Sequence, residues 1–407
     1  MTAEKTLEQR KRLYQVLLIA GIIVISFNLR PAITSVGPLI GVIRDDINLT
    51  NWSAGLLTSL PLIAFAIMSP FAARLGNRYS YEGAMVIGLI LLLFGISIRS
   101  MSVVVLLFTG TIFAGLGIAI LNVLLPGLIK DKFPYKVGIM TSIYSTTMGI
   151  VAATASGISI PFAVNLNLGW QLALLVWTIP AILGIIIWLF LRKKNPKPKQ
   201  YTDSPKVKYV HASNKRIWHS PLAWQIAAFM GLQSFIFYVT ISWLPEILHA
   251  SGMSMVTAGW MLSFTQFVGL PASFIVPVLA EKVKSTRGIV FTLTLSCIVG
   301  YGGLLVSNHL AVIIISVIFI GLSLSGVFSL ALTFLGMRAR TAEDAAELSG
   351  MAQSLGYILA ASGPILIGFL FDLSGSWTYP IIAIMAITVL ELIFGLLVSK
   401  ERYVYDK

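Results

Sequence analysis

The chain has 407 residues, of which 57% are hydrophobic and only 11% are charged, and its 29 basic and 16 acidic side chains give a net charge of +13. A typical soluble domain has about 25% charged residues, and its surface needs more polar side chains than this chain contains. The high hydrophobic fraction also excludes an intrinsically disordered chain. We therefore expect a membrane protein with many spanning segments.

Twelve apolar runs, separated by charged and turn residues, follow one another along the chain. The runs have 18 to 31 residues, which is long enough for a membrane-spanning helix of roughly 20 residues. None shows the alternation of polar and apolar residues that is typical of strands in a membrane barrel. The sequence therefore predicts an all-α polytopic membrane protein with twelve transmembrane helices, at residues 13–43, 52–73, 82–99, 102–128, 137–163, 168–191, 222–246, 255–280, 287–306, 309–336, 346–371 and 377–399.

Basic residues are concentrated in every second connection between these runs. If the N-terminus is cytoplasmic, 26 of the 29 basic residues lie in cytoplasmic segments, Arg44 and Arg99 lie in outer loops, and Arg30 lies inside the first helix. Cytoplasmic loops of membrane proteins carry such an excess of lysine and arginine. We expect a multi-pass protein of the cell membrane, in a bacterium the inner membrane, with both termini in the cytoplasm. Because this orientation explains the positive charge, nucleic-acid binding is not expected.

The longest polar stretch, residues 192–220, is rich in lysine and contains three prolines. Such a composition is typical of a linker, and we expect this one to be cytoplasmic. It would separate an N-terminal six-helix bundle, residues 1–191, from a C-terminal six-helix bundle, residues 221–407.

The two halves of the sequence resemble each other at an offset of about 207 residues. Gly149, which is followed by small residues, matches Gly356, and Pro70 matches Pro277. These matches indicate two parallel six-helix repeats, which is the arrangement of the major facilitator fold.

The segment from Phe27 to Pro38 reads Phe-Asn-Leu-Arg-Pro-Ala-Ile-Thr-Ser-Val-Gly-Pro. It resembles the first-helix motif of the cyanate and 2-nitroimidazole porters (CynX/NimT) of the major facilitator superfamily. The resemblance extends over the whole chain and implies a twelve-helix secondary transporter that moves a small, often anionic or polar solute by alternating access. Further similar pieces are Leu124-Leu125-Pro126, Trp243-Leu244-Pro245 and Gln353-x-Leu355-Gly356-Tyr357.

One loop departs from the pattern of the superfamily. Members usually carry a Gly-x-x-x-Asp-Arg-x-Gly-Arg type loop between the second and third helices. The corresponding stretch, residues 73–78, reads Ala-Arg-Leu-Gly-Asn-Arg and has no aspartate, whereas the matching loop of the second half keeps Glu281 beside Lys282. We therefore expect the usual cytoplasmic latch to be altered in the first half only.

Arg30 is the candidate residue with the most specific signal. It lies near the middle of the first predicted helix, where an arginine costs about 2.5–3.5 kcal/mol and is expected to face the bundle interior or a water-filled cavity. Pro31 cannot donate a hydrogen bond to the carbonyl of Phe27 and is expected to kink the helix. The freed carbonyl and the guanidinium donors would suit an anion. The alternative is a structural pair with a carboxylate, for which Glu391 is a weak candidate, or hydrogen bonds to backbone carbonyls.

Other polar side chains within the predicted helices are candidates for the same site, where we expect the solute to bind at the midplane between the two bundles. Asn28 and Ser35 share a face of the first helix. Gln353 and Tyr357 share a face of the eleventh helix. For each candidate, hydrogen bonding between helices is an equally reasonable role. The predicted substrate-binding residues are Arg30, Asn28, Thr34, Asn122, Gln233, Tyr238, Gln266, Gln353 and Tyr357.

Four residues are predicted to serve coupling or gating: Glu391, Gly149, Gly356 and Trp243. Glu391 is the one carboxylate well inside a predicted helix and is a candidate for relaying protons, with packing or a place at the lipid interface as the alternative. The two glycines lie in small-residue stretches that let helices approach closely and slide. Trp243, near the outer end of its helix, is expected to anchor the membrane interface or to act as a gate.

The remaining features receive structural interpretations. The aromatic residues Phe235 and Phe237 are interpreted as packing. The acids at helix ends, Glu246, Glu347 and Asp372, are interpreted as exposed.

The sequence shows no catalytic constellation. Cys297 is the single cysteine, the four histidines have no ligand spacing, and no phosphate-binding loop or metal motif is visible. We expect a transporter and not an enzyme, monomeric, with no cofactor, with a small anionic or polar solute and membrane lipid as partners and protons as a candidate coupling ion. The alternatives are a uniporter or efflux porter of small neutral heterocycles or drugs and, with less support, a channel, since no filter loop is visible.

Overall fold

The computed structural model describes residues 2–133, 137–194, 217–339, 342–400 and 402–404, and every regular element in these ranges is a helix. Twelve segments of these helices are long and apolar enough to cross a membrane. The predicted fold class, an all-α membrane protein with twelve transmembrane helices, is confirmed. Of the predicted linker at 192–220, residues 195–216 lie outside the described residues, and the three residues before them continue a helix.

The helices follow the predicted runs closely, and most differ only at their ends. We call α1 to α8 the first half and α9 to α14 the second half. The first half contains α1 (Thr2–Leu29), α2 (Pro31–Thr34), α3 (Val36–Ile47), α4 (Asn51–Arg99), α5 (Val104–Lys132), α6 (Val137–Ile160), the π-helical turn η1 (Pro161–Asn165), α7 (Gly169–Leu175) and α8 (Thr178–Lys194). The second half, after the short turn η2 (Ile217–His219), contains α9 (Pro221–Ala250), α10 (Met255–Lys282), α11 (Arg287–Val306), α12 (Leu310–Met337), α13 (Ala342–Ser374) and α14 (Thr378–Val398).

The first predicted helix is interrupted at Arg30, as the proline after it predicts. α1 ends at Leu29, and Pro31 occupies the first position of α2. Proline is favoured there because its missing N–H would have no partner in the first turn of a helix. The carbonyl of Arg30 accepts hydrogen bonds from the backbone N–H groups of Ile33 and Thr34 at 2.9 and 3.0 Å. The interruption therefore lies directly at the candidate site.

α4 contains two spanning segments, Asn51–Ser69 and Arg78–Arg99, where the sequence predicts two helices with a loop between them. The chain turns at Ser80, which has a φ of 67° and a ψ of 163°. Its hydroxyl accepts a hydrogen bond from the N–H of Gly83 at 3.3 Å, in the manner of a helix N-cap. A kink at one residue, and not the predicted loop at 74–81, therefore connects these spans.

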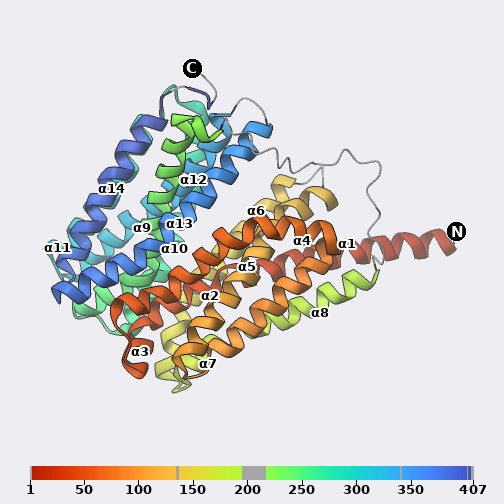
Figure 1. Cartoon of the computed structure of the whole chain (residues 1–407), viewed down its shortest axis with the longest axis horizontal. Coiled ribbons are helices and arrows are strands. Elements are labelled where there is room, and N and C mark those ends of the chain that lie inside the picture. The colour runs from red at the N-terminus through yellow and green to blue at the C-terminus, as the bar shows by residue number, and fades with distance from the viewer. Residues whose placement is uncertain (1, 134–136, 195–216, 340–341, 401, 405–407) are drawn as a thin grey trace.

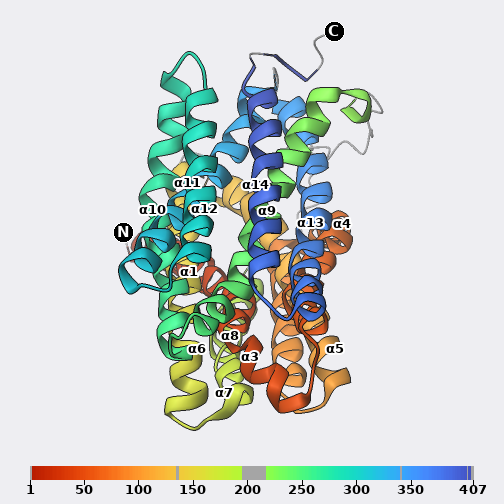
Figure 2. The same cartoon turned by 90° about the vertical axis from the view of Figure 1, so that its left-hand side faces the viewer.

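Figure 1 shows that the helices of the first half and those of the second half gather in two groups. The groups meet near α2 and α3 and diverge toward the two chain termini, and the turned view shows the same division (Figures 1 and 2). Contacts between the halves are made by α4 with α13, α6 with α10, and α3 with α9. We call the end of the protein where α3, α9 and α13 finish the Arg44 end.

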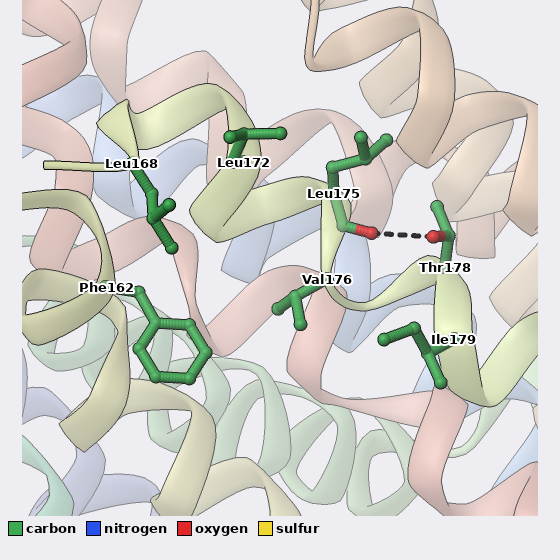
Figure 3. A pocket seen from close by; sticks show the side chains of 7 residues that line it. All are labelled: Phe162, Leu168, Leu172, Leu175, Val176, Thr178 and Ile179. Carbon is green, nitrogen blue, oxygen red and sulfur yellow. Dashed lines mark hydrogen bonds between the residues drawn. The ribbon is translucent and has the colours of Figure 1, made fainter. Parts of the chain in front are cut away.

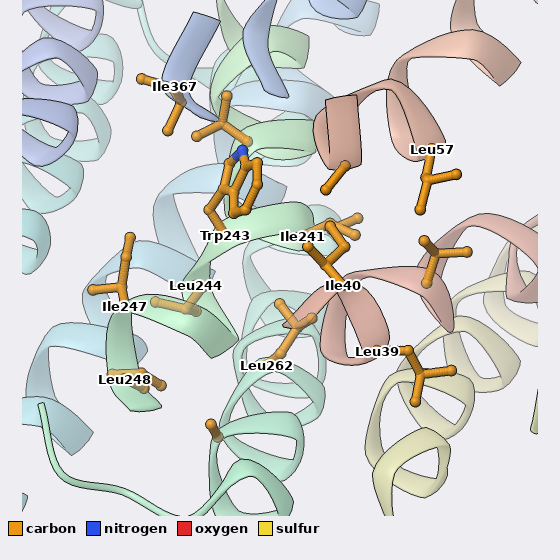
Figure 4. Packing of buried hydrophobic residues seen from close by; sticks show 14 of the residues in the cluster. Leu39, Ile40, Leu57, Ile241, Trp243, Leu244, Ile247, Leu248, Leu262 and Ile367 are labelled. Atoms are coloured by element: carbon orange, nitrogen blue, oxygen red, sulfur yellow. The ribbon is translucent and has the colours of Figure 1, made fainter. Parts of the chain in front are cut away.

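The halves pack tightly through apolar side chains toward the Arg44 end. Leu39, Ile40 and Leu57 of the first half belong to one buried cluster with Ile241 and Trp243 of the second half, and Figure 4 shows Ile40 beside Ile241. Deeper along the same contact, the hydroxyls of Thr58 and Ser242 lie 2.7 Å apart. The two halves are therefore joined at this end by a continuous surface of buried side chains.

Candidate functional site

The Arg30 side chain lies at the contact between the two halves. It is partly buried, and its guanidinium carbon lies 5.2 Å from the centre of the Phe237 ring, which belongs to α9. Within the part of the chain that the structure describes, its guanidinium makes no hydrogen bond and no ion pair. A cation over an aromatic face is attracted by the electrons of the ring, but its donors remain unused. The guanidinium is therefore free to bind a ligand group.

Aromatic side chains from three helices surround this position. The Phe237 ring packs edge-on against Tyr238 at 5.2 Å, and Phe65 of α4 packs edge-on against Tyr357 of α13 at 5.7 Å. Both tyrosines lie close enough to Arg30 for its charge to act on them. Of the predicted site residues, the structure thus brings together Arg30, Tyr238 and Tyr357. It adds Phe237, which the sequence interpretation assigned to packing.

The other candidates of the first helix are buried near the interruption. The Asn28 amide donates to the carbonyl of Val24 at 2.7 Å, while its oxygen has no partner. The Thr34 hydroxyl donates to the carbonyl of Ala152 on α6 at 3.1 Å. The Ser35 hydroxyl is fully buried and has no partner. Thr34 thus joins two helices, whereas Asn28 and Ser35 keep polar atoms without a protein partner.

The predicted glutamines bond to neighbouring protein groups. Gln233 donates to the carbonyl of Leu324 at 3.1 Å, and Gln353 donates to the hydroxyl of Ser349 at 2.8 Å. Gln266 donates to the Ser156 hydroxyl at 2.9 Å and so connects α10 with α6 across the two halves. The contacts of Gln233 and Gln266 correspond to the alternative role that the sequence left open, hydrogen bonding between helices, whereas the contact of Gln353 lies within α13. Asn122 of α5 is partly buried.

Glu391 faces the interior of the second half. Its side chain is 2% exposed, which excludes the lipid interface; of the two structural alternatives, packing remains beside the role in relaying protons. It lies close enough to the thiol of Cys297 on α11 for its charge to act there, and Thr388, one turn earlier, contacts the same sulfur at 3.8 Å. No ion pair joins it to Arg30 among the described residues. Burial of a carboxylate between helices follows from the packing of α14 against α11 and α9.

The predicted gating residues lie in different surroundings. Trp243 is fully buried, so it is not an anchor at the membrane interface, and its indole N–H donates to the carbonyl of Pro364 at 2.9 Å. A Cβ atom on Gly149 would lie 3.7 Å from Leu270 of the other half, an ordinary contact. A Cβ atom on Gly356 would meet Gly231 within the second half at 3.5 Å.

Tighter glycine contacts between the halves occur elsewhere. A Cβ atom on Gly37 would collide with the carbonyl oxygen of Ile241, and one on Gly55 would lie 2.5 Å from that of Pro364. Both obstacles are backbone atoms, which cannot turn away as a flexible side chain can. These positions could not be recognised from the sequence because their neighbours come from the other half.

Polar side chains join the halves at the Arg44 end. Arg44 of α3 donates to the carboxylate of Glu246 on α9 at 3.1 Å and to the amide oxygen of Asn51 at 2.8 Å. Asn51 in turn donates to Asp372 of α13 through its backbone N–H at 3.1 Å and its side-chain amide at 2.6 Å. Glu246 is only 6% exposed, so its interpretation as an exposed helix-end acid is wrong.

The charge of Arg44 is held by these contacts. Partial burial lowers the pKa of Arg44, but the hydrogen bonds and negative charges of Asp45 and Glu246 outweigh this effect and raise the pKa above its ordinary value. The guanidinium is therefore charged at any physiological pH, and the pair with Glu246 is a true ion pair. Its Asp45 partner is mostly exposed and lies on the same helix.

Arg99 also lies in a place that the sequence did not predict. It ends α4, yet its side chain is 1% exposed and donates to the carbonyl of Ala32 at 2.7 Å. The expectation that it lies in an outer loop is therefore wrong. The side chain turns into the first half because the helix ends against α5, where Gly110 allows a close approach.

A shallow pocket of about 360 Å³ lies apart from all these residues. Figure 3 shows its apolar lining, from Phe162 and Leu168 to Ile179. Leu172 and Ile179 are about half exposed, and the hydrogen bond from Thr178 to the carbonyl of Leu175 closes the turn between α7 and α8. The pocket offers a ligand no charged group and contains none of the predicted site residues.

Comparison with known proteins decides the family. A sequence model described as Major Facilitator Superfamily matches residues 17–361. The chain belongs to the major facilitator superfamily. It is 46% identical to an uncharacterized transporter, YycB, of Bacillus subtilis (strain 168), over 97% of this chain and 96% of that protein. It is 40% identical to the 2-nitroimidazole transporter of Escherichia coli (strain K12), over 99% of both chains.

The superfamily assignment agrees with the fold. The structure resembles that of a bacterial homologue of the human lysosomal transporter Spinster, in an inward-facing and occupied conformation, with a TM-score of 0.76 over 95% of this chain and 97% of that one. The two sequences are 15% identical, so this likeness concerns the fold alone. The predicted resemblance to the cyanate and nitroimidazole porters is confirmed, and the protein is a secondary transporter of the membrane and not an enzyme.

Proposed function

We propose that this superfamily member moves a small anionic or polar solute by alternating access, and that the solute binds at Arg30 between the two halves, at the midplane of the membrane. The observation that carries the proposal is the unpaired guanidinium of Arg30 over Phe237. A partly buried arginine whose donors are unused favours an anionic group, to which it can offer two parallel hydrogen bonds.

The aromatic walls of the site favour a flat solute. The Phe237 ring lies under the cation, Tyr238 and Tyr357 lie within reach of its charge, and Phe65 packs against Tyr357. Flat conjugated groups stack on such rings with little loss of conformational freedom. This observation also supports the second candidate, a porter of small neutral heterocycles, and a relative that is 40% identical is named for 2-nitroimidazole.

The coupling and gating roles are part of the same proposal. The contacts of Arg44, Glu246, Asn51 and Asp372 would break when the Arg44 end opens. Trp243 supports the Pro364 backbone that meets Gly55. Glu391, a buried carboxyl group without a cation beside it among the described residues, is the candidate for carrying a proton.

Substitution of Arg30 tests the site. We expect Arg30→Ala to abolish counterflow of small anions in proteoliposomes while the purified protein keeps its thermal stability. Arg30→Lys should restore only part of the binding, because a point charge replaces a planar fork. Arg192→Ala, which removes an exposed arginine from α8, is the matched control and should transport normally.

The same measurements separate the competing roles. Loss of stability in Arg30→Ala with unchanged binding per folded molecule would assign Arg30 to structure. A stable Arg30→Ala protein that binds and transports like the wild type would contradict both the site and the anionic solute. If Arg30→Ala loses transport of anions but keeps transport of neutral heterocycles, the second candidate, a porter of small neutral heterocycles, would be favoured for the neutral solutes.

We infer cytoplasmic termini and a cytoplasmic 192–220 linker from the distribution of basic residues. Single cysteines at Ser204 and Asn308, in a Cys297→Ala background, should react with an impermeant maleimide from opposite sides of the membrane. Reaction of both from the outside would contradict this orientation.

A further inference from the structure

Arg99 is a fully buried arginine that lies next to the interruption of the first helix. Its Nη1 donates to the carbonyl of Ala32, while its Nε and Nη2 atoms are buried without any partner. No acidic side chain pairs with it among the described residues. A structural arginine inside a bundle is expected to meet a carboxylate or several carbonyls, because an unpaired buried charge is strongly unfavourable. A purely structural role therefore explains Arg99 poorly.

The position of its partner connects Arg99 with the candidate site. Ala32 follows Arg30 by two residues, so its backbone lies within about 8 Å of that of Arg30. Ala32 belongs to the four-residue helix α2, between the interruption at Arg30 and the turn at Ser35. The hydrogen bond from Arg99 thus holds the short segment from which Arg30 projects. Movement of that segment would move the Arg30 side chain relative to Phe237.

The positive charge of Arg99, like that of Arg30, attracts an anionic solute. Neither guanidinium has a counter-ion in the described parts of the chain. Arg30 belongs to the interrupted first helix, and Arg99 of α4 donates to Ala32, two residues after Arg30. Both guanidiniums are thus placed near one segment of the first helix, and in a medium of low dielectric constant each positive charge attracts an anion bound there. Two uncompensated cations therefore favour an anion at Arg30 over an uncharged molecule of the same shape.

We propose that Arg99 is a specificity-determining residue, which holds the interrupted segment and makes the Arg30 site select an anionic solute over its neutral analogue. The inference rests on the proposed binding of solute at Arg30. Arg99 acts through its charge and through Ala32, so it is a positioning residue and does not contact the solute. The buried charge of Arg99 lowers the stability of the protein, and its function is to make the Arg30 site select an anionic solute over its neutral analogue.

Replacement by methionine gives the sharpest test. Arg99→Met keeps the length and approximate volume of the side chain but removes the charge and the donors. Replacing a buried charged group with an apolar one of similar volume is often neutral or stabilising. Since no acid is left unpaired here, we expect Arg99→Met to melt at the same temperature as the wild type or higher. A structural arginine would instead lower the melting temperature when removed.

Selectivity is measured with matched pairs of flat probes. The pairs are benzoate with benzamide and nicotinate with nicotinamide, and the readout is the ratio of their dissociation constants with purified protein. We expect the wild type to prefer the anion of at least one pair, and Arg99→Met to lower this preference about tenfold by weakening anion binding alone. Arg99→Lys, which keeps the charge, should retain most of the preference.

Each outcome decides between the two proposals. An unchanged ratio in a folded Arg99→Met protein, with binding lost in Arg30→Ala, would overturn the role of Arg99 and leave the Arg30 site intact. A wild type that prefers no anion to its amide would overturn both. If Arg99→Met does not fold, the expected gain in stability is wrong and Arg99 is structural.

Discussion

The guanidinium of Arg44 on α3 and the carboxylate of Glu246 on α9 form an ion pair, 3.1 Å from Nη1 to Oε2, that joins the two halves of the transporter. The residues are 202 positions apart in the sequence, and the Glu246 side chain is almost fully buried. Its second carboxylate oxygen has no hydrogen-bond partner. The pair is therefore suited to close the Arg44 end in this arrangement and to separate when that end opens.

Removal of the Glu246 charge is expected to loosen this closure. Truncating one partner of a buried charge pair weakens an interface by about 2–5 kcal/mol. In a Cys297→Ala background, Thr58→Cys would report opening, because Thr58 is buried against Ser242 of the other half. Glu246→Gln should raise the rate at which the thiol of Thr58→Cys reacts with maleimide by at least about tenfold.

The matched control for this pair is Asp45→Asn. Asp45 also binds Arg44, at 2.9 Å, but it is exposed and lies on the same helix. Its removal should leave the labelling rate near that of the parent protein. Equal rates in the Glu246 and Asp45 variants would mean that the ion pair does not hold the halves together.

A methyl group at Gly55 is expected to prevent close contact of the halves. The added Cβ would lie 2.5 Å from the carbonyl oxygen of Pro364, whereas the Cβ of Gly149→Ala would lie 3.7 Å from a leucine side chain. Gly55→Ala should reduce transport about tenfold and raise labelling of Thr58→Cys, because backbone atoms must move apart. Gly149→Ala should behave like the wild type. Normal transport by Gly55→Ala would show that this contact is not needed in the transport cycle.

Phe237 and Phe235 are expected to differ although only one residue separates them. Phe237 lies under the Arg30 guanidinium, while Phe235 is buried against Gly363 within the second half. Phe237→Ala should weaken solute binding about tenfold, since it removes a cation–π contact and a wall of the site. Phe235→Ala should mainly lower the melting temperature, because it leaves a cavity in a packed core. The opposite pattern in binding and melting experiments would place the site elsewhere.

Glu391→Gln tests proton coupling. The substitution keeps the shape of a buried side chain but removes its ability to carry a proton. We expect stimulation by an inward pH gradient to disappear while counterflow without a gradient remains. Thr388→Val is the control, because it changes the hydroxyl beside Cys297 on the same face of α14 without changing a titratable group. A normal response of Glu391→Gln to the gradient would exclude this residue as the proton carrier.

Much of the fold could be predicted from the sequence because membrane insertion depends on local properties. A run of about 20 apolar residues forms a spanning helix whatever its neighbours are, since its backbone must satisfy its own hydrogen bonds in lipid. Pro31 interrupts the first helix for an equally local reason, its missing N–H and fixed ring. Arg30 was visible as a candidate because a charge inside an apolar run is rare.

The partners of these residues depended on tertiary structure. Phe237 lies more than two hundred residues from Arg30, and in the sequence it cannot be distinguished from Phe235, which only packs. Glu246 ends an apolar run like any exposed acid, and only the approach of α3 buries it beside Arg44. Arg99 stands at the end of an apolar run, where an arginine usually belongs to the following loop, yet its long side chain turns inward to Ala32. Hydropathy and spacing are properties of one segment, so they determined the helices, the interruption and the cation within the first apolar run. The surroundings of that cation arise from contacts between segments, which only the packing of the two halves decides.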